Sequence, residues 1–284
     1  MTLYGHSGDI YSLAVLQNGD LVSGSADNEI KIWNLINGTI RMTLNGHSGA
    51  VWSLAVLQNG DLASGSVDDK IKIWNLINGT EKITLDGHSG AVYSLAALQN
   101  GDLVSGSADN EIKIWNLING TEKMTLNGHS GVVYSLAVLQ NGDLASGSRD
   151  KTIKIWNLVD GTIRITLNGH SDWVRSLGVL QNGDLASGSS DKTIKIWNLV
   201  DGTQKMTLKG HSCWVRSFVV LKNGDLVSAS DDKTIKIWNL IDENEKMTLN
   251  CHSGPVFSIV DLQNGDFASG SRDKTIKIWS YLVD

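Results

Sequence analysis

The sequence is poor in proline and cysteine, the residues that most often interrupt or cross-link a domain. Its 284 residues include a single proline, Pro255, and two cysteines, Cys213 and Cys251. Two cysteines without the spacing of metal ligands exclude the disulfide framework of a small secreted domain. We expect both to be free thiols, although one bridge between them remains an open alternative.

Long apolar runs and an excess of positive charge are also missing. No apolar run approaches the roughly 18 residues that span a bilayer, and the N-terminus lacks the features of a signal peptide. Lysine and arginine total 24 against 30 aspartate and glutamate residues, a net charge of -6 that argues against a binder of nucleic acid or acidic membranes. Because 41% of the residues are hydrophobic, the chain can build a core. We therefore expect a folded cytoplasmic protein without a nucleic-acid or membrane partner.

What the sequence has in abundance is repetition, because three residue types recur every 41 positions. The seven histidines of the chain are His6, His47, His88, His129, His170, His211 and His252. The tryptophans on the same step are Trp33, Trp74, Trp115, Trp156, Trp197, Trp238 and Trp279. The aspartates on this step are Asp27, Asp68, Asp109, Asp150, Asp191, Asp232 and Asp273. A period of this length indicates internal duplication in a solenoid, a propeller or an array.

Each unit contains four short strands and no helical periodicity, and residues 47–85 serve as the example. The apolar runs are 51–57, 62–66, 71–74 and 83–85. An Asn-Gly pair separates the first two runs, and it is the strongest short signal for a hairpin, whose favoured turn holds both central residues at positive φ. The first run breaks strict alternation at Val51, Leu54 and Val56, which predicts a β-bulge near Trp52 that redirects its side chain.

The chain ends favour a closed ring over a linear stack. Met1-Thr2-Leu3 repeats the tripeptide of a fourth strand, Met42-Thr43-Leu44, while the last unit stops shortly after its third strand at Trp279. The first residues can therefore complete the last unit, and a radial arrangement leaves only short strand edges exposed. We predict an all-β, seven-bladed propeller of four-stranded antiparallel blades, formed by one domain over residues 1–284 and closed by its N-terminal strand.

The succession of Gly-His, Ser, Asp and Ile-Lys-Ile-Trp in each unit resembles the WD-repeat β-propeller family over the whole chain. The resemblance implies a buried, hydrogen-bonded tetrad of His, Ser, Asp and Trp in every unit. The serines that complete the seven tetrads are Ser23, Ser64, Ser105, Ser146, Ser187, Ser228 and Ser269. The family's Trp-Asp dipeptide is Trp-Asn here, or Trp-Ser at Trp279, which leaves the tetrad unchanged.

The chemistry of these four side chains supports a structural role. Trp donates one hydrogen bond, Ser donates and accepts, neutral His does one of each and Asp accepts, so a chain from Trp to Ser to His to Asp satisfies every member. A trio of Ser, His and Asp also catalyses acyl transfer elsewhere. We reject that interpretation because this trio recurs seven times beneath a Trp. We expect no enzyme, no catalytic residue, no metal and no cofactor.

The units differ from one another at three positions near the His loop and the Asp turn, where aromatic residues and arginines replace one another. Four of the six arginines lie at these positions and none of the 18 lysines does. Trp, Tyr and Arg dominate binding hot spots, from which Lys is depleted. We expect these residues to bind a ligand on the top face around the central channel: Tyr11, Trp52, Tyr93, Tyr134, Arg149, Trp173, Arg175, Trp214, Arg216, Phe257 and Arg272.

Two hypotheses account for these residues. In the first, they bind a protein or peptide, acidic or phosphorylated, through bidentate arginine contacts. In the second, the aromatic residues fill the seam between units and the arginines stack on tryptophan as cation-π pairs. Elsewhere, we interpret the lysines two residues before each periodic Trp as a solvated strand face, and the repeated Gln-Asn-Gly-Asp turns as a uniform acidic face.

The leading functional prediction is a monomeric, non-catalytic scaffold for protein interactions. One alternative is a lectin-like propeller whose aromatic platforms stack on sugars, which predicts equivalent pockets in most units. Another is a purely structural repeat domain, natural or engineered, without an evolved ligand.

Overall fold

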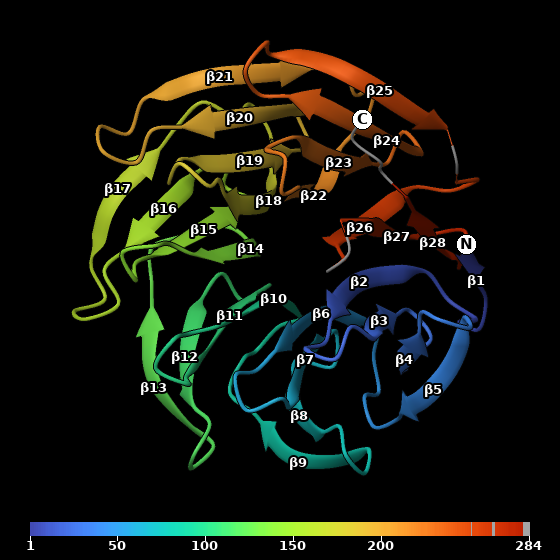
Figure 1. The fold of residues 1–284 in the computed structure, drawn as a ribbon. Coiled ribbons are helices and arrows are strands. Elements are labelled where there is room, and N and C mark those ends of the chain that lie inside the picture. The colour runs from blue at the N-terminus through green and yellow to red at the C-terminus, as the bar shows by residue number, and fades with distance from the viewer. Residues whose placement is uncertain (251, 263–264, 281–284) are drawn as a thin grey trace.

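The computed structural model describes residues 1–250, 252–262 and 265–280. Within these residues, 28 strands form seven four-stranded antiparallel sheets arranged as the blades of a ring (Figure 1). The described residues contain no helix that is long and apolar enough to cross a bilayer. The predicted all-β, seven-bladed propeller is confirmed.

The first four blades each contain four strands that are consecutive in sequence. Blade 1 consists of β2 (Ile10–Val15), β3 (Leu21–Ser25), β4 (Ile30–Asn34) and β5 (Thr39–Leu44). Blade 2 consists of β6 (Val51–Val56), β7 (Leu62–Ser66), β8 (Ile71–Asn75) and β9 (Thr80–Leu85). Blade 3 consists of β10 (Val92–Ala97), β11 (Leu103–Ser107), β12 (Ile112–Asn116) and β13 (Thr121–Leu126). Blade 4 consists of β14 (Val133–Val138), β15 (Leu144–Ser148), β16 (Ile153–Trp156) and β17 (Ile163–Leu167).

The remaining blades repeat this order, except that the last one takes its outer strand from the N-terminus. Blade 5 consists of β18 (Val174–Val179), β19 (Leu185–Ser189), β20 (Thr193–Trp197) and β21 (Gln204–Lys209). Blade 6 consists of β22 (Val215–Val220), β23 (Leu226–Ser230), β24 (Thr234–Asn239) and β25 (Asn244–Asn250). Blade 7 consists of β26 (Val256–Asp261), β27 (Phe267–Ser271), β28 (Ile276–Trp279) and β1 (Thr2–Leu3).

The N-terminal strand closes the ring as predicted. In β1, Thr2 pairs with Lys277 and Leu3 with Ile276 of β28. The backbone carbonyl of Met1 accepts a further hydrogen bond from the amide of Ile278 at 2.8 Å. Leu3 is 2% exposed, so this short clasp also contributes to the core.

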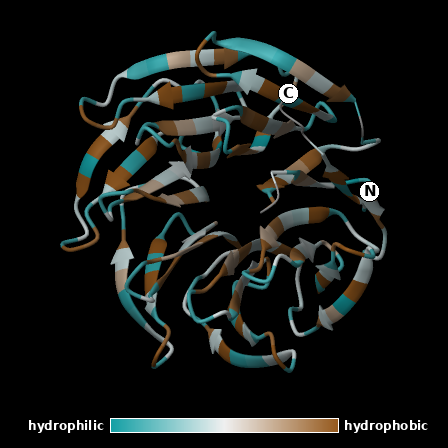
Figure 2. Ribbon diagram, viewed as in Figure 1, coloured by the Kyte–Doolittle hydropathy of each residue, from teal (hydrophilic) through white to brown (hydrophobic). Residues whose placement is uncertain are grey.

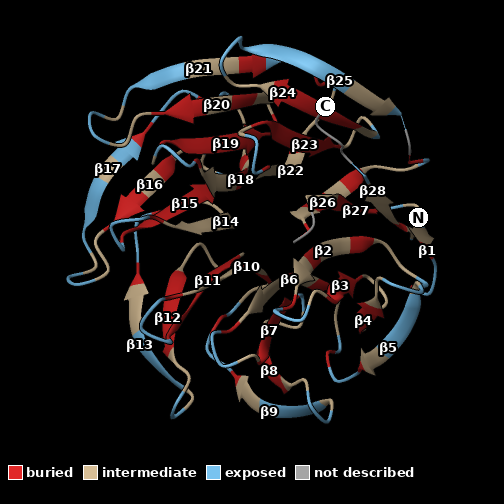
Figure 3. Cartoon of the chain, viewed as in Figure 1, coloured by how far each residue is buried: buried red, intermediate tan, exposed pale blue. Residues whose placement is uncertain are grey.

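The hydrophobic core lies between neighbouring blades. One cluster joins Ile30 and Leu44 of blade 1 to Val51 and Trp74 of blade 2, and six similar clusters surround the axis. In blades 1 to 6 the second and third strands are largely buried, whereas the outermost strands are exposed over much of their length (Figure 3). The same outer strands carry hydrophilic segments (Figure 2). Each blade therefore depends on its neighbours for the burial of its apolar faces.

The innermost strand of every blade contains the predicted bulge. In blade 2, Val51 pairs with Ser66 and Ser53 with Gly65, so Trp52 is an extra residue without a partner. The same register shift occurs in the other six blades. The residue inside each bulge lines the central channel.

The turn between the first two strands differs from the prediction. In blade 1, the amide of Gly19 donates to the carbonyl of Leu16 at 2.9 Å, and the amide of Leu16 donates to Asp20 at 2.9 Å. Only Gly19 has a positive φ, 86°, while Asn18 does not. The expectation that both residues of the Asn-Gly pair adopt positive φ is wrong, because the turn is a three-residue loop that ends in a left-handed glycine.

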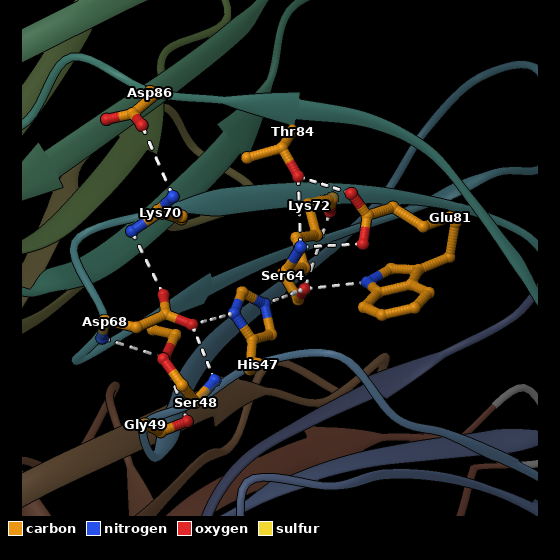
Figure 4. Close-up of polar contacts among 12 residues, drawn as sticks. His47, Ser48, Gly49, Ser64, Asp68, Lys70, Lys72, Glu81, Thr84 and Asp86 are labelled. Carbon is orange, nitrogen blue, oxygen red and sulfur yellow. Dashed lines mark hydrogen bonds and ion pairs between the residues drawn. The ribbon is translucent and has the colours of Figure 1, made fainter.

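The interpretation of the periodic lysines as a solvated face is wrong for four of the seven. Lys31, Lys72, Lys113 and Lys236 are at most 9% exposed. In Figure 4, the Lys72 ammonium donates to Glu81 at 2.6 Å and to Thr84 at 3.0 Å. The fourth strand covers the lysine and supplies acceptors for its charge.

The repeated turn aspartates do not form an acidic face. Six of them are at most 8% exposed: Asp20, Asp61, Asp102, Asp143, Asp184 and Asp225. Each forms an ion pair with a Lys or Arg of the fourth strand of its blade, at 2.6 to 3.0 Å. The prediction is wrong because it did not take into account the cation that comes 21 residues later.

Candidate functional site

The predicted tetrad is a continuous hydrogen-bonded chain in blade 2 (Figure 4). The indole N–H of Trp74 donates to Ser64 Oγ at 2.8 Å, and Ser64 Oγ lies 2.7 Å from His47 Nε2. His47 Nδ1 lies 2.8 Å from Asp68 Oδ2, which also accepts the backbone amide of Ser48 at 2.9 Å. The chain links the third strand, the second strand, the His loop and the Asp turn.

The other six blades contain the same three contacts. The distances are 2.7 to 2.9 Å from Trp to Ser, 2.7 to 2.8 Å from Ser to His and 2.7 to 2.8 Å from His to Asp. We call these seven networks the tetrad layer. Because every member has a partner, the layer fixes the position of each His loop against its blade.

Burial and pairing set the protonation of the tetrads. Burial alone would raise the pKa of Asp109, but the hydrogen bond and charge of His88, together with the backbone amides of Glu111 and Ser89, outweigh it and lower that pKa to about 2. Burial lowers the pKa of His47 and His252 against the opposing effect of their aspartates. In these two blades a neutral imidazole therefore donates from Nδ1 to an ionised carboxylate and accepts the serine hydroxyl at Nε2.

The tetrad serines are inaccessible to a substrate. All seven are 0% exposed, and each hydroxyl is already engaged by Trp and His. An acyl-transfer nucleophile needs an exposed hydroxyl beside a site for the oxyanion. The arrangement supports rigidity rather than this chemistry.

One group of possible metal ligands, His6, Asp27 and Glu29, is present among the described residues. His6 Nδ1 is hydrogen-bonded to Asp27 at 2.8 Å, and Glu29 forms an ion pair with Lys31 at 2.6 Å. Each of these ligand atoms thus has a partner within the protein. The group belongs to the tetrad layer and its immediate surroundings.

The seven bulge residues form a belt around the mouth of the channel. We call this set the channel-mouth belt; its members are Tyr11, Trp52, Tyr93, Tyr134, Arg175, Arg216 and Phe257. The structure therefore brings together residues that are spread over the whole sequence. Trp173 and Trp214 adjoin the belt, because both contact its arginines.

The aromatic part of the belt is a run of ring contacts. Tyr11 stacks on Trp52 with centroids 3.9 Å apart and planes 7° from parallel. Edge-on contacts follow from Trp52 to Tyr93 at 5.0 Å and from Tyr93 to Tyr134 at 5.3 Å. Phe257 lies 5.3 Å from Tyr11 on the other side. All five rings are half-buried and line the central cavity.

The two belt arginines complete the circle through cation-π contacts. The guanidinium of Arg175 lies 4.7 Å from the Tyr134 ring and 4.4 Å from the Trp214 ring. The guanidinium of Arg216 lies 4.9 Å from Trp214 and 5.2 Å from Phe257. These are the contacts that the packing hypothesis predicts.

The belt also surrounds a cavity of about 230 Å³. Seven serines line this cavity together with the belt: Ser12, Ser53, Ser94, Ser135, Ser176, Ser217 and Ser258. Sequence reasoning missed these serines, although each follows a variable bulge residue and so recurs with the period. Ser135, Ser217 and Ser258 accept a backbone amide from the next blade, at 2.9 to 3.2 Å.

The remaining predicted contact residues lie outside the belt and differ in their surroundings. Arg149 is exposed and lies 4.5 Å from the Trp173 ring. Arg272 is also exposed and approaches Asp9 at 3.7 Å. Cys213 is a free, half-buried thiol, whereas Cys251 lies outside the described residues.

Comparison with protein-family models gives one match, repeated along the chain. The model described as WD domain, G-beta repeat, matches residues 1–34, 38–75, 79–116, 120–157, 160–198, 202–239 and 243–280. A search of curated proteins found no match.

Proposed function

Because the chain belongs to the WD40 repeat family, a fold that typically serves as a scaffold for protein interactions, we propose that its channel-mouth belt binds a protein or peptide segment. The observation that carries the proposal is the joint presence of five half-buried aromatic rings and a cavity in their midst. Aromatic rings offer large contact areas at a low cost in side-chain entropy. The scaffold itself does no chemistry.

The asymmetry of the belt favours a polypeptide over a repeated small ligand. Blades 1 to 4 contribute Tyr11, Trp52, Tyr93 and Tyr134, while blades 5 and 6 contribute Arg175 and Arg216. A segment that lies across the mouth would place apolar side chains on the first part and an acidic or phosphorylated residue near the second. A lectin-like site would need similar pockets in separate blades, whereas the belt surrounds one shared cavity.

A peptide-display selection against the whole protein tests the proposal. Peptides selected on the wild type are measured against a Tyr11→Ala/Trp52→Ala double variant, which removes the stacked pair, and against Ile77→Ala, whose side chain is 94% exposed in a turn of blade 2. We expect at least about tenfold weaker binding to the belt variant and unchanged binding to the control. Selected peptides that bind both variants equally would overturn the proposal, and binding to a glycan array in their place would favour the lectin-like alternative.

A further inference from the structure

Blades 5 and 6 place an arginine at the same belt position but give it different partners. Arg216 donates from Nε and Nη2 to the two carboxylate oxygens of Asp231, at 2.7 and 2.8 Å. Arg175 donates from Nε to Ser190 Oγ at 2.8 Å. Ser190 and Asp231 are equivalent residues, each directly before a tetrad aspartate. Blade 6 thus neutralises its arginine internally, and blade 5 replaces the carboxylate with a neutral hydroxyl.

Arg175 forms no ion pair among the described residues, and Asp231 and Asp172 act on its charge only electrostatically. Three aromatic rings, Tyr134, Trp173 and Trp214, surround its guanidinium at 4.4 to 4.7 Å and displace water from it. Burial, together with the nearby Arg216, lowers the pKa of Arg175 to about 10, so the group remains protonated at neutral pH. Aromatic faces compensate only part of the hydration that a buried cation loses.

Arg175 also has hydrogen-bonding capacity to spare. A guanidinium carries five N–H donors, and only the one on Nε has a hydrogen-bond partner in the part of the chain that the structure describes. The side chain lines the cavity, as does the adjacent Ser176, whose buried hydroxyl has no described partner. In the neighbouring blade, the exposed Arg149 adds a second positive charge beside Trp173.

We propose that Arg175 is the anchor for a single anionic group, a carboxylate or a phosphoryl group, that enters the channel mouth from the bound segment. The inference rests on the proposed function and specifies what the partner must carry. A fork of guanidinium N–H groups matches either anion in bidentate geometry, as Asp231 already demonstrates for Arg216. The cavity of about 230 Å³ suits one side chain rather than a cluster of charges.

The two blades supply the variants for the test. Ser190→Asp gives Arg175 the internal carboxylate that Arg216 has, while keeping the arginine and its stacking. Ser190→Asn is the matched control, since it differs from the first variant only in charge. Asp231→Asn is the reverse change, which releases Arg216 to accept an anion.

The probes are inorganic phosphate and three short peptides of one sequence that carry Glu, phosphoserine or Gln at the centre. Binding is followed by NMR at the guanidinium Nε–H signals of Arg175 and Arg216. We expect saturable shifts of the Arg175 signal with phosphate and with both acidic peptides, and none with the Gln peptide. Ser190→Asp should weaken this binding by at least about tenfold, Ser190→Asn should retain it, and Asp231→Asn should add a response at Arg216.

The outcomes separate this inference from the proposed function. Equal anion binding by Ser190→Asp and the wild type, or no saturable shift at Arg175, would overturn the anchor. Display-selected peptides that still depend on the aromatic pair would leave the belt site standing in that case. The relative affinities for the acidic peptide, the phosphopeptide and free phosphate identify the source of the anion.

Discussion

The tetrad layer and the channel-mouth belt use the same seven blades in opposite ways. In the tetrad layer, every blade presents the same four side chains with nearly the same distances. In the belt, one backbone position carries Tyr, Trp, Arg or Phe, depending on the blade. Buried side chains that must supply hydrogen-bond partners to one another cannot vary between blades. A position that faces a cavity has no such constraint and accepts different side chains. The tetrad layer thus gives every blade the same rigid structure, while the belt makes the blades differ from one another.

The largest expected effect breaks the tetrad layer. Ser146→Ala removes the hydroxyl that joins Trp156 to His129, which leaves two buried polar groups without a partner. At roughly 1 to 3 kcal/mol for each unpaired group, we expect the free energy of unfolding to fall by about 3 kcal/mol. Urea unfolding measures the loss, and Ser130→Ala, an exposed serine of the same blade, serves as the control. A loss equal to that of the control would contradict the role of the network.

The second largest effect is expected from a deletion that opens the ring at the clasp and leaves the belt residues unchanged. Deletion of residues 1–4 removes β1 and the buried Leu3, and it exposes the edge of β28. An unpaired edge is a template for strands of other molecules, so we expect lower stability together with dimers or aggregates. Size-exclusion chromatography with light scattering detects them. An unchanged melting temperature with a monomeric elution profile would speak against this role of the clasp.

A third, smaller effect compares two positions within the belt. Arg216→Ala leaves the largely buried carboxylate of Asp231 without its partner. Because the two side chains are 15% and 13% exposed, we expect a loss of about 2 kcal/mol, between the values for exposed and for fully buried pairs. Arg175→Ala leaves no carboxylate behind and should cost less than Arg216→Ala. Thermal unfolding of both variants measures the two losses of stability and shows which is larger. A loss as large as that of Ser146→Ala at either position would show that the belt arginine stabilises the fold as the tetrads do.

The smallest expected effect is a change of stability with pH, which should come from the tetrad layer and not from the channel-mouth belt. The pKa of His47 and of His252 is lowered in the folded state, so the unfolded chain binds more protons below about pH 6.5. The free energy of unfolding should therefore decline from pH 7.5 to 5, and again below about pH 4 as the tetrad aspartates are protonated. The belt consists of Tyr, Trp, Arg and Phe, whose side chains ordinarily do not titrate between pH 7.5 and 4, and burial raises the pKa of Tyr11 and Tyr93 still further from this range. Urea unfolding at several pH values tests the sign, and a rise in stability toward pH 5 would be the contrary result.

The fold was largely predictable because its signals are local or periodic. The Asn-Gly turns, the broken alternation around Trp52 and the repeated Met-Thr-Leu each specify a strand or a pairing within or between units. The predictions for the four buried periodic lysines and for the six paired turn aspartates were wrong because the environment of these residues depends on the fourth strand, whose exposed half gives a weak sequence pattern.

The ion pair within the belt could not be predicted from the sequence either. Arg216 and Asp231 are 15 positions apart, and they meet only because the bulge between Val215 and Ser217 turns the arginine toward the end of β23. A regular strand would direct residue 216 elsewhere. The periodic pattern predicted a top-face position for Arg216, but a pairing that depends on one irregular residue cannot be deduced from spacing.

The clasp has a consequence for the order of events during synthesis on the ribosome. The strand β1 pairs with β28, which follows it in the sequence by more than 270 residues. Blades 1 to 6 can each assemble from consecutive strands as they emerge, whereas residues 1–3 must wait until residues 276–278 have been translated. Throughout that interval the nascent chain is an open arc with an unfinished seventh blade, and the ring can close only after β28 has been synthesised.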